Sequence, residues 1–244
     1  AQMLPTVLDR LNVYAAMGER SIENSVAPAF IFRPLETNRV PTMGPLVTRE
    51  PLPDVTRPED LRELLWAEIP VLASLIHSRQ VSCVEMTRLF LERLREVDAM
   101  LHCVISYTED RALHQAKTLD EELAAGKYRG LLHGIPYGVK DLCAVKGTRT
   151  SWGATPYKDQ KIEVDATVVK NREVAGAVLV AQPTPAAPAM GDVWSAGKTH
   201  SPSNIAPAAS GLPAGFHTAG GRGELLFALR LNSLGSTIAS PTIC

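Results

Sequence analysis

The sequence lacks several features that would narrow its function at once. Its four cysteines lie far apart without a Cys-x-x-Cys pair, and its six histidines form no His-x-x-x-His pair. This spacing argues against a zinc site and against a disulfide framework. No apolar run reaches the roughly 18 residues that a bilayer-spanning helix needs, and no secretory leader is visible. We therefore expect a cytoplasmic protein without a membrane association, unless a leader has been removed before Ala1.

An excess of charge of one sign is also missing. The chain has 25 Lys and Arg against 26 Asp and Glu, and its few aromatic residues are scattered. Without a basic run, direct binding to nucleic acid has no support. With 244 residues, of which 45% are hydrophobic, the chain can form one large domain or two small ones.

The first 58 residues differ in character from the rest. Residues 1–17 carry apolar side chains at helical spacing, which predicts a helix. Seven prolines between residues 26 and 58 interrupt every candidate helix. We predict an extended arm lying over a domain formed by residues 59–244; a disordered linker is the alternative.

The next segment predicts helices with one apolar face. Pro70 can open a helix that continues through Gln80. Ser82 and Glu85 form a capping box for a second helix, and Thr108 can cap a third. A short strand is expected at residues 103–107. The predicted buried residues of the second and third helices are Cys83, Met86, Phe90, Leu94, Val97, Ala112, Ala116, Leu119 and Leu123.

A βαβ arrangement is expected further along. Residues 135–139 form a short apolar run that is typical of a buried strand. Asp165 can cap a helix through Ala175, and after Gly176 residues 177–181 have the composition of a second strand. Helix, glycine and apolar strand in this order predict a parallel strand pair.

Lys140 stands at the end of the first of these strands. A lysine there either extends its ammonium group to water or is held partly desolvated, in which case it can serve as a base. The first interpretation is the commoner one, since buried lysines are rare.

Three ordered motifs bear on this choice. They resemble the amidase signature family of serine hydrolases, and the resemblance covers roughly residues 65–244. It implies an α/β fold with a mixed β-sheet sandwiched between helices, preceded by the helical and proline-rich arm. The motifs are residues 134–142 (GIPYGVKDL), residues 165–169 with 175–181, and Leu234, Gly235 and Ser236 followed by Ser240 and Pro241.

The resemblance implies a chemistry as well. Family members cleave amide bonds with a serine nucleophile, a bridging serine and a neutral lysine base, through an acyl-serine intermediate. By this resemblance Lys140 is the base and Ser236 the nucleophile. Ser233, Leu234 and Gly235 would form the turn that binds the oxyanion of the substrate. The substrate would be a small-molecule amide, and no metal or organic cofactor is implied.

The bridging serine is where the sequence departs from the family pattern. Counting back from Ser236 places Leu212 and Pro213 where the family has two serines, and the nearest hydroxyl is Ser210. Either Ser210 takes over the bridge or the proton relay is broken, and we favour a broken relay. The sequence between this loop and Ser236 also fits the family poorly, as a shifted reading frame or divergence without selection would produce.

Three functional hypotheses remain beside amide hydrolysis. The protein could be the ammonia-releasing subunit of a glutamine-dependent aminoacyl-tRNA amidotransferase, a catalytically impaired or truncated amidase homologue, or a generic α/β binding domain. The family's sheet normally draws strands from residues beyond position 244, so an exposed strand edge is expected. We therefore expect a fragment, or a chain that pairs with a second copy or a partner subunit.

Overall fold

The computed structural model describes residues 51–184 and 193–200, the backbone at 228–229, and a few positions between 11 and 23. The chain divides into two units, residues 1–50 and 51–244. In the first unit residues 11–13, 15, 16 and 18 are helical, which agrees with the helix expected near the start of the chain. The domain boundary at residue 58 stays a prediction.

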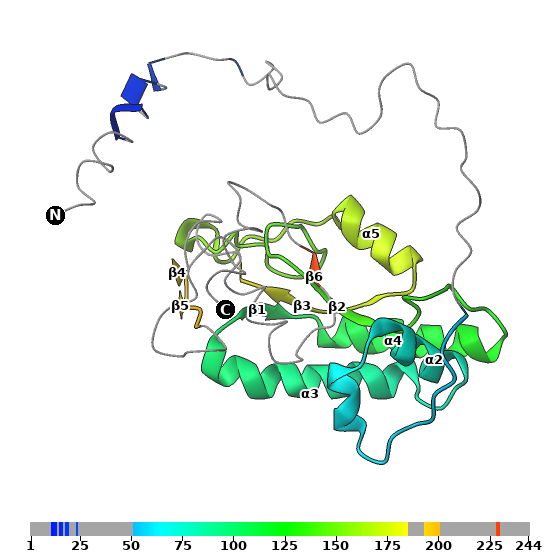
Figure 1. Ribbon diagram of the computed structural model, residues 1–244. Helices are drawn as coiled ribbons and strands as arrows, with labels where there is room; N and C mark the ends of the chain where they lie inside the picture. The colour runs from blue at the N-terminus through cyan, green and yellow to red at the C-terminus, as the bar shows by residue number, and fades with distance from the viewer. Residues whose placement is uncertain are drawn as a thin grey trace. The chain divides into compact units, whose positions relative to one another are not determined.

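A mixed four-stranded sheet forms the centre of the second unit (Figure 1). Its strands are β1 (Val104–Tyr107), β2 (Pro136–Val139), β3 (Val178–Pro183) and β6 (Ala228–Leu229), in the order β1-β3-β2-β6. β2 runs parallel to both β3 and β6, whereas β1 is antiparallel to β3. The expected parallel strand pair and the mixed sheet are thus confirmed.

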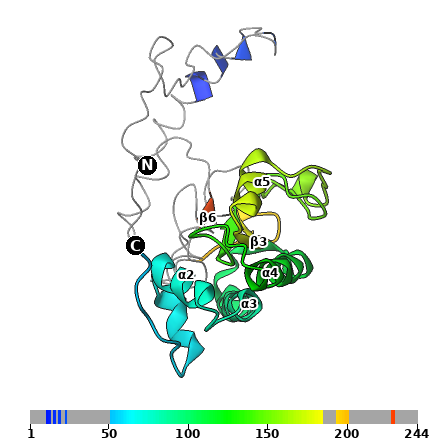
Figure 2. The ribbon, with the colours of Figure 1, turned by 90° about the vertical axis from the view of Figure 1, so that its right-hand side faces the viewer.

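Helices cover both faces of this sheet, as Figures 1 and 2 show from two directions. α3 (Cys83–Leu101) and α4 (Glu109–Ala124) lie on one face together with α2 (Ile69–His77). The shorter α5 (Thr167–Val174), which connects β2 to β3, lies on the other. The sandwich of helices around a sheet therefore has the predicted form.

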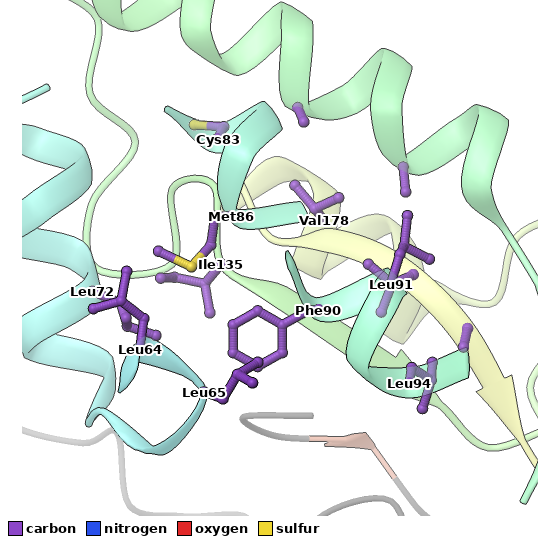
Figure 3. Packing of buried hydrophobic residues seen from close by; sticks show 14 of the residues in the cluster. Leu64, Leu65, Leu72, Cys83, Met86, Phe90, Leu91, Leu94, Ile135 and Val178 are labelled. Carbon is purple, nitrogen blue, oxygen red and sulfur yellow. The ribbon is translucent and has the colours of Figure 1, made fainter. Parts of the chain in front are cut away.

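The two faces bury separate apolar clusters because neighbouring strand residues point in opposite directions. Val178 and Val180 belong to the larger cluster on the α3 and α4 side. Tyr137, Val139 and Leu179 pack with the α5 side in the smaller one. Figure 3 shows the larger cluster, with the ring of Phe90 beside Leu65 and with Met86 and Ile135 close by. All nine residues predicted to face the core from α3 and α4 are buried.

The helix boundaries agree with the sequence in part. The capping box at the start of α3 is present: Ser82 Oγ accepts a hydrogen bond from Glu85 N, and the Glu85 carboxylate accepts one from Ser82 N. α2 contains Pro70 in its first turn but ends at His77 instead of Gln80. The chain turns there through Arg79, whose φ is 59°, and the Gln80 amide donates to the Val55 carbonyl.

Two predicted caps are wrong. Thr108 precedes α4, but its hydroxyl donates to the Leu179 carbonyl at 2.6 Å, which ties the helix start to β3 instead of capping the helix. Asp165 does not cap α5, which begins at Thr167 after Ala166. The Asp165 carboxylate accepts two hydrogen bonds from Arg111, at 2.8 and 3.0 Å, and one from Lys146 N. A bidentate ion pair with a guanidinium has displaced the local cap.

The remaining described elements are short. They are the 3-10 helices η1 (Leu61–Trp66) and η2 (Thr155–Tyr157), and a hairpin of β4 (Val193–Trp194) and β5 (Gly197–Lys198). Residues 51–58 run along α2, where the Pro53 carbonyl accepts from the Ser74 hydroxyl at 2.6 Å. None of the helices within the described ranges has the length and apolar character to span a membrane.

The core packing yields a first prediction. Phe90→Ala removes a fully buried ring from the larger cluster, and we expect it to lower the free energy of unfolding by roughly 3–5 kcal/mol. Val174→Ala removes a side chain that is 75% exposed, and we expect a change within about 0.5 kcal/mol. Urea denaturation followed by circular dichroism measures both values, and equal values for the two variants would contradict the assigned core.

Candidate functional site

The carboxyl ends of β2 and β3 bring polar side chains together at one edge of the sheet. Because the two strands are parallel, both end on the same side. Lys140 and Asp141 follow β2 directly, and Gln182 lies near the end of β3. All three are buried, with exposed fractions of at most 1%. Such a concentration of buried polar groups at a strand edge is typical of a functional site.

The side chain of Lys140 is 1% exposed. Its ammonium group therefore does not extend to water, and the commoner interpretation of this lysine is wrong. Burial of the Cys143 thiol raises its pKa, while the charge of Lys140 opposes that rise, so the two side chains lie within electrostatic reach. The Lys140 carbonyl accepts a hydrogen bond from Cys143 N at 2.9 Å, which starts the turn after β2.

Asp141 binds the loop that follows it. Its Oδ2 accepts hydrogen bonds from both the backbone N–H and the hydroxyl of Ser151, at 2.9 and 2.7 Å. Its Oδ1 accepts from the Gln182 amide at 3.4 Å. The Gln182 Oε1 in turn accepts from the Thr148 hydroxyl at 2.6 Å. The four side chains connect β2, β3 and the intervening loop.

Burial raises the pKa of the Asp141 carboxyl to about 6, although hydrogen bonds from Ser151 and the next two backbone N–H groups oppose the rise. Desolvation disfavours the charged form more strongly than these donors stabilise it. Asp141 is therefore held at a cost in free energy.

The turn into β2 depends on a glycine. Gly134 has a φ of 79°, and a Cβ placed there would lie 2.4 Å from Cys83 Sγ. The preceding His133 is buried between two backbone groups: its Nδ1 accepts from Arg129 N, and its Nε2 donates to the Leu119 carbonyl. Burial also lowers the pKa of His133. A neutral histidine and a glycine thus fix the direction in which β2, and with it Lys140, enters the sheet.

The other predicted site residues lie outside the described part of the chain. These are Ser210, Leu212, Pro213, Ser233, Leu234, Gly235 and Ser236. Their predicted roles remain predictions. Within the described ranges, no group of three His, Cys, Asp or Glu side chains is arranged to hold a metal ion.

Sequence reasoning missed Asp141, Ser151 and Gln182. Asp141 carried a signal, because an aspartate next to a buried lysine is unusual and lies within the same motif. Ser151 carried a weaker one, in a loop rich in glycine and threonine. Nothing in the sequence distinguishes Gln182 from an ordinary polar residue at a strand end.

Comparison with known proteins agrees with this geometry. A family model described as Amidase matches residues 85–205. AmiD of Mycobacterium tuberculosis (strain ATCC 25618 / H37Rv), a protein named as an amidase, is 38% identical over 113 residues, or 46% of this chain and 24% of AmiD. The glutamyl-tRNA(Gln) amidotransferase of Pseudomonas aeruginosa (strain UCBPP-PA14) contains a second relative, its A subunit, which is 42% identical over 118 residues, or 48% of this chain and 24% of that protein.

Solved structures share the fold. A crystal structure of an amidase superposes with a TM-score of 0.62 and 26% identity, covering 70% of this chain and 39% of that one. The peptide amidase PAM, bound to the competitive inhibitor chymostatin, gives a TM-score of 0.59 and 28% identity, covering 63% and 34%. The chain belongs to the amidase signature family. The matched stretch spans about a quarter of the length of the curated relatives.

The glycine turn can be tested with a matched pair of substitutions. Gly134→Ala adds a left-handed alanine and a steric clash with Cys83, and we expect a loss of about 2–5 kcal/mol in the free energy of unfolding. Gly147→Ala has a similar φ of 84° with nothing within 4 Å of the added Cβ, so only about 1–2 kcal/mol should be lost. Chemical denaturation gives both values; a smaller loss at position 134 would contradict the clash.

The pKa of Asp141 predicts a pH dependence of stability. The folded value of about 6 exceeds the unfolded value of about 4, so this contribution is complete below pH 4 and is lost as pH rises through 6. Asp141→Asn does not titrate. The free energy of unfolding of this variant, minus that of the wild type, should therefore rise by on the order of 2–3 kcal/mol from about pH 4 to pH 7.5.

Urea titrations across this pH range measure the difference. Ser151→Ala keeps the Asp141 carboxyl and serves as the control, which should retain a pH dependence of the wild-type direction. A difference between Asp141→Asn and wild type that stays constant with pH would show that Asp141 titrates normally.

Proposed function

We propose that the protein hydrolyses a carboxamide C–N bond through an acyl-serine intermediate. Lys140 acts as the base and Ser236 as the nucleophile. The observation that supports this assignment is the complete burial of Lys140 at the carboxyl edge of parallel strands. Burial disfavours the ammonium form of a lysine, and only the neutral amine can accept a proton.

In the proposed reaction the neutral amine of Lys140 accepts a proton through a bridging hydroxyl, and Ser236 Oγ attacks the amide carbonyl. Backbone N–H groups of the turn Ser233, Leu234 and Gly235 stabilise the oxyanion. The proton then passes to the leaving nitrogen as the C–N bond breaks, and ammonia or an amine departs. Water hydrolyses the acyl-serine by the same route in reverse. No step needs a metal or an organic cofactor.

A second candidate is an amidotransferase component that transfers the ammonia to an aminoacyl-tRNA bound by partner subunits. The 42% identity to the Pseudomonas aeruginosa amidotransferase protein favours it. Both candidates use the same amide cleavage. Co-purification of partner subunits, with ammonia released only in their presence, would favour the second.

Replacing the proposed base tests the assignment. We expect Lys140→Ala to lower kcat by about 10²–10⁴-fold, the usual contribution of a general base, while the circular dichroism spectrum stays that of the wild type. The measurement is ammonia release from acetamide, propionamide and benzamide. Lys146→Ala removes an exposed lysine of the same loop and should leave kcat unchanged. Wild-type activity in Lys140→Ala would contradict the proposal, and unfolding of the variant would mark a structural lysine.

The identity of the bridging hydroxyl is a separate question. If Ser210 replaces the serines missing at Leu212 and Pro213, Ser210→Ala should reduce ammonia release about as much as Ser236→Ala. A Ser210→Ala variant with full activity would exclude Ser210 from the relay. An inactive wild type would favour the catalytically impaired homologue.

A further inference from the structure

The peptide that joins Lys140 to Asp141 is held on three sides. The Asp141 N–H donates to the Pro183 carbonyl at 3.2 Å, which fixes it to the end of β3. The Asp141 carboxylate accepts from Ser151 on one oxygen and from Gln182 on the other. A residue directly after a four-residue strand would ordinarily be free to change its backbone angles. Here the backbone that carries Lys140 has little freedom left.

Ser151 is itself fixed by this arrangement. Its hydroxyl donates to Asp141 Oδ2 and accepts from Gly153 N at 3.2 Å, and the side chain is buried. Trp152 follows with a φ of 53°, an uncommon backbone conformation for a bulky residue. The loop after Lys140 therefore returns to the strand end and closes over it through a single carboxylate.

A carboxylate is a costly choice for this position. An uncharged residue would avoid the desolvation that burial imposes on Asp141, and strained or costly groups of this kind gather at functional sites. Asp141 is not needed for the larger core, because it contacts the loop and the strand ends rather than the cluster around Phe90. The residue that gains most from its presence is the adjacent Lys140.

We propose that Asp141 and Ser151 are positioning residues, which hold the amine of Lys140 buried and correctly directed at the edge of the sheet. This inference rests on the proposed role of Lys140 as the base. Asp141 fixes the backbone after the lysine, and Ser151 fixes Asp141. Neither side chain takes a proton in the reaction.

The test measures the position of Lys140 without using activity. Folded protein is treated with N-acetoxysuccinimide, and acetylation of each lysine is followed by mass spectrometry. We expect Lys140 to react far more slowly than the exposed Lys146 in the wild type. Asp141→Asn and Ser151→Ala should each increase the acetylation rate of Lys140 by at least tenfold. Asp98→Asn is the matched control, because Asp98 also accepts backbone hydrogen bonds from Cys103 and Val104 at the start of a strand.

A second probe separates local release from general opening. The thiols of Cys83 and Cys103 are buried in the core, so a maleimide labels them only when the fold opens. Faster acetylation of Lys140 with protected thiols, and no change in Asp98→Asn, is the expected result. Unchanged acetylation in both variants would overturn the proposal. Parallel increases in lysine and thiol labelling would also overturn it, since they would assign Asp141 a general structural role.

Amide hydrolysis provides an independent arm. If the wild type releases ammonia, both variants should lose at least tenfold in kcat with little change in KM, because substrate binding does not involve the buried pair. If the wild type hydrolyses none of the amides, the proposed function fails while the acetylation result still decides whether Lys140 is held by Asp141 and Ser151.

Discussion

The removal of Lys140 and Asp141 from water is the constraint on which the rest of the structure depends. Two neighbouring ionisable residues are buried at the end of a strand of only four residues. Burial of charge is costly unless hydrogen bonds compensate for the lost water. The loop from residue 141 to 151 and the end of β3 supply donors to Asp141, and the apolar clusters on both faces of the sheet exclude solvent. Fold and site are therefore parts of a single arrangement.

The glycine turn before β2 contributes to the same arrangement from the other side. Gly134 allows the chain to pass against Cys83 at the start of α3, and the neutral His133 binds α4 through the Leu119 carbonyl. The direction of β2 is thus set by the helices on one face of the sheet. The depth at which Lys140 lies follows from that direction, so changes in the helical layer would reach the site through β2.

Much of this fold could be predicted from the sequence, because the helices carry strong local signals. The stripe of α3 and its capping box depend on residues within a few positions of one another, and both are present as expected. The predicted caps at Thr108 and Asp165 failed for the opposite reason. Each side chain found a partner far along the chain, Leu179 and Arg111 respectively, and no local pattern records such a choice.

The site could be predicted less completely than the fold. Lys140 stood out because a charge at the end of an apolar run conflicts with local expectation. Gln182 could not be found, since its role arises only when β3 lies beside β2. Family membership adds the expectation of a serine nucleophile, but the chain departs from the family pattern at Leu212 and Pro213. The proposed chemistry therefore depends on whether the amine of Lys140 and the hydroxyl of Ser236 act together.

Reaction with a fluorophosphonate tests that central claim most directly, because the reagent labels a serine only when a base activates it. The labelled residue is identified by peptide mass spectrometry in the wild type and in Lys140→Ala. The account predicts a single modified serine at position 236, with labelling lost when the lysine is removed. An unlabelled Ser236, or one labelled equally in both proteins, would contradict it.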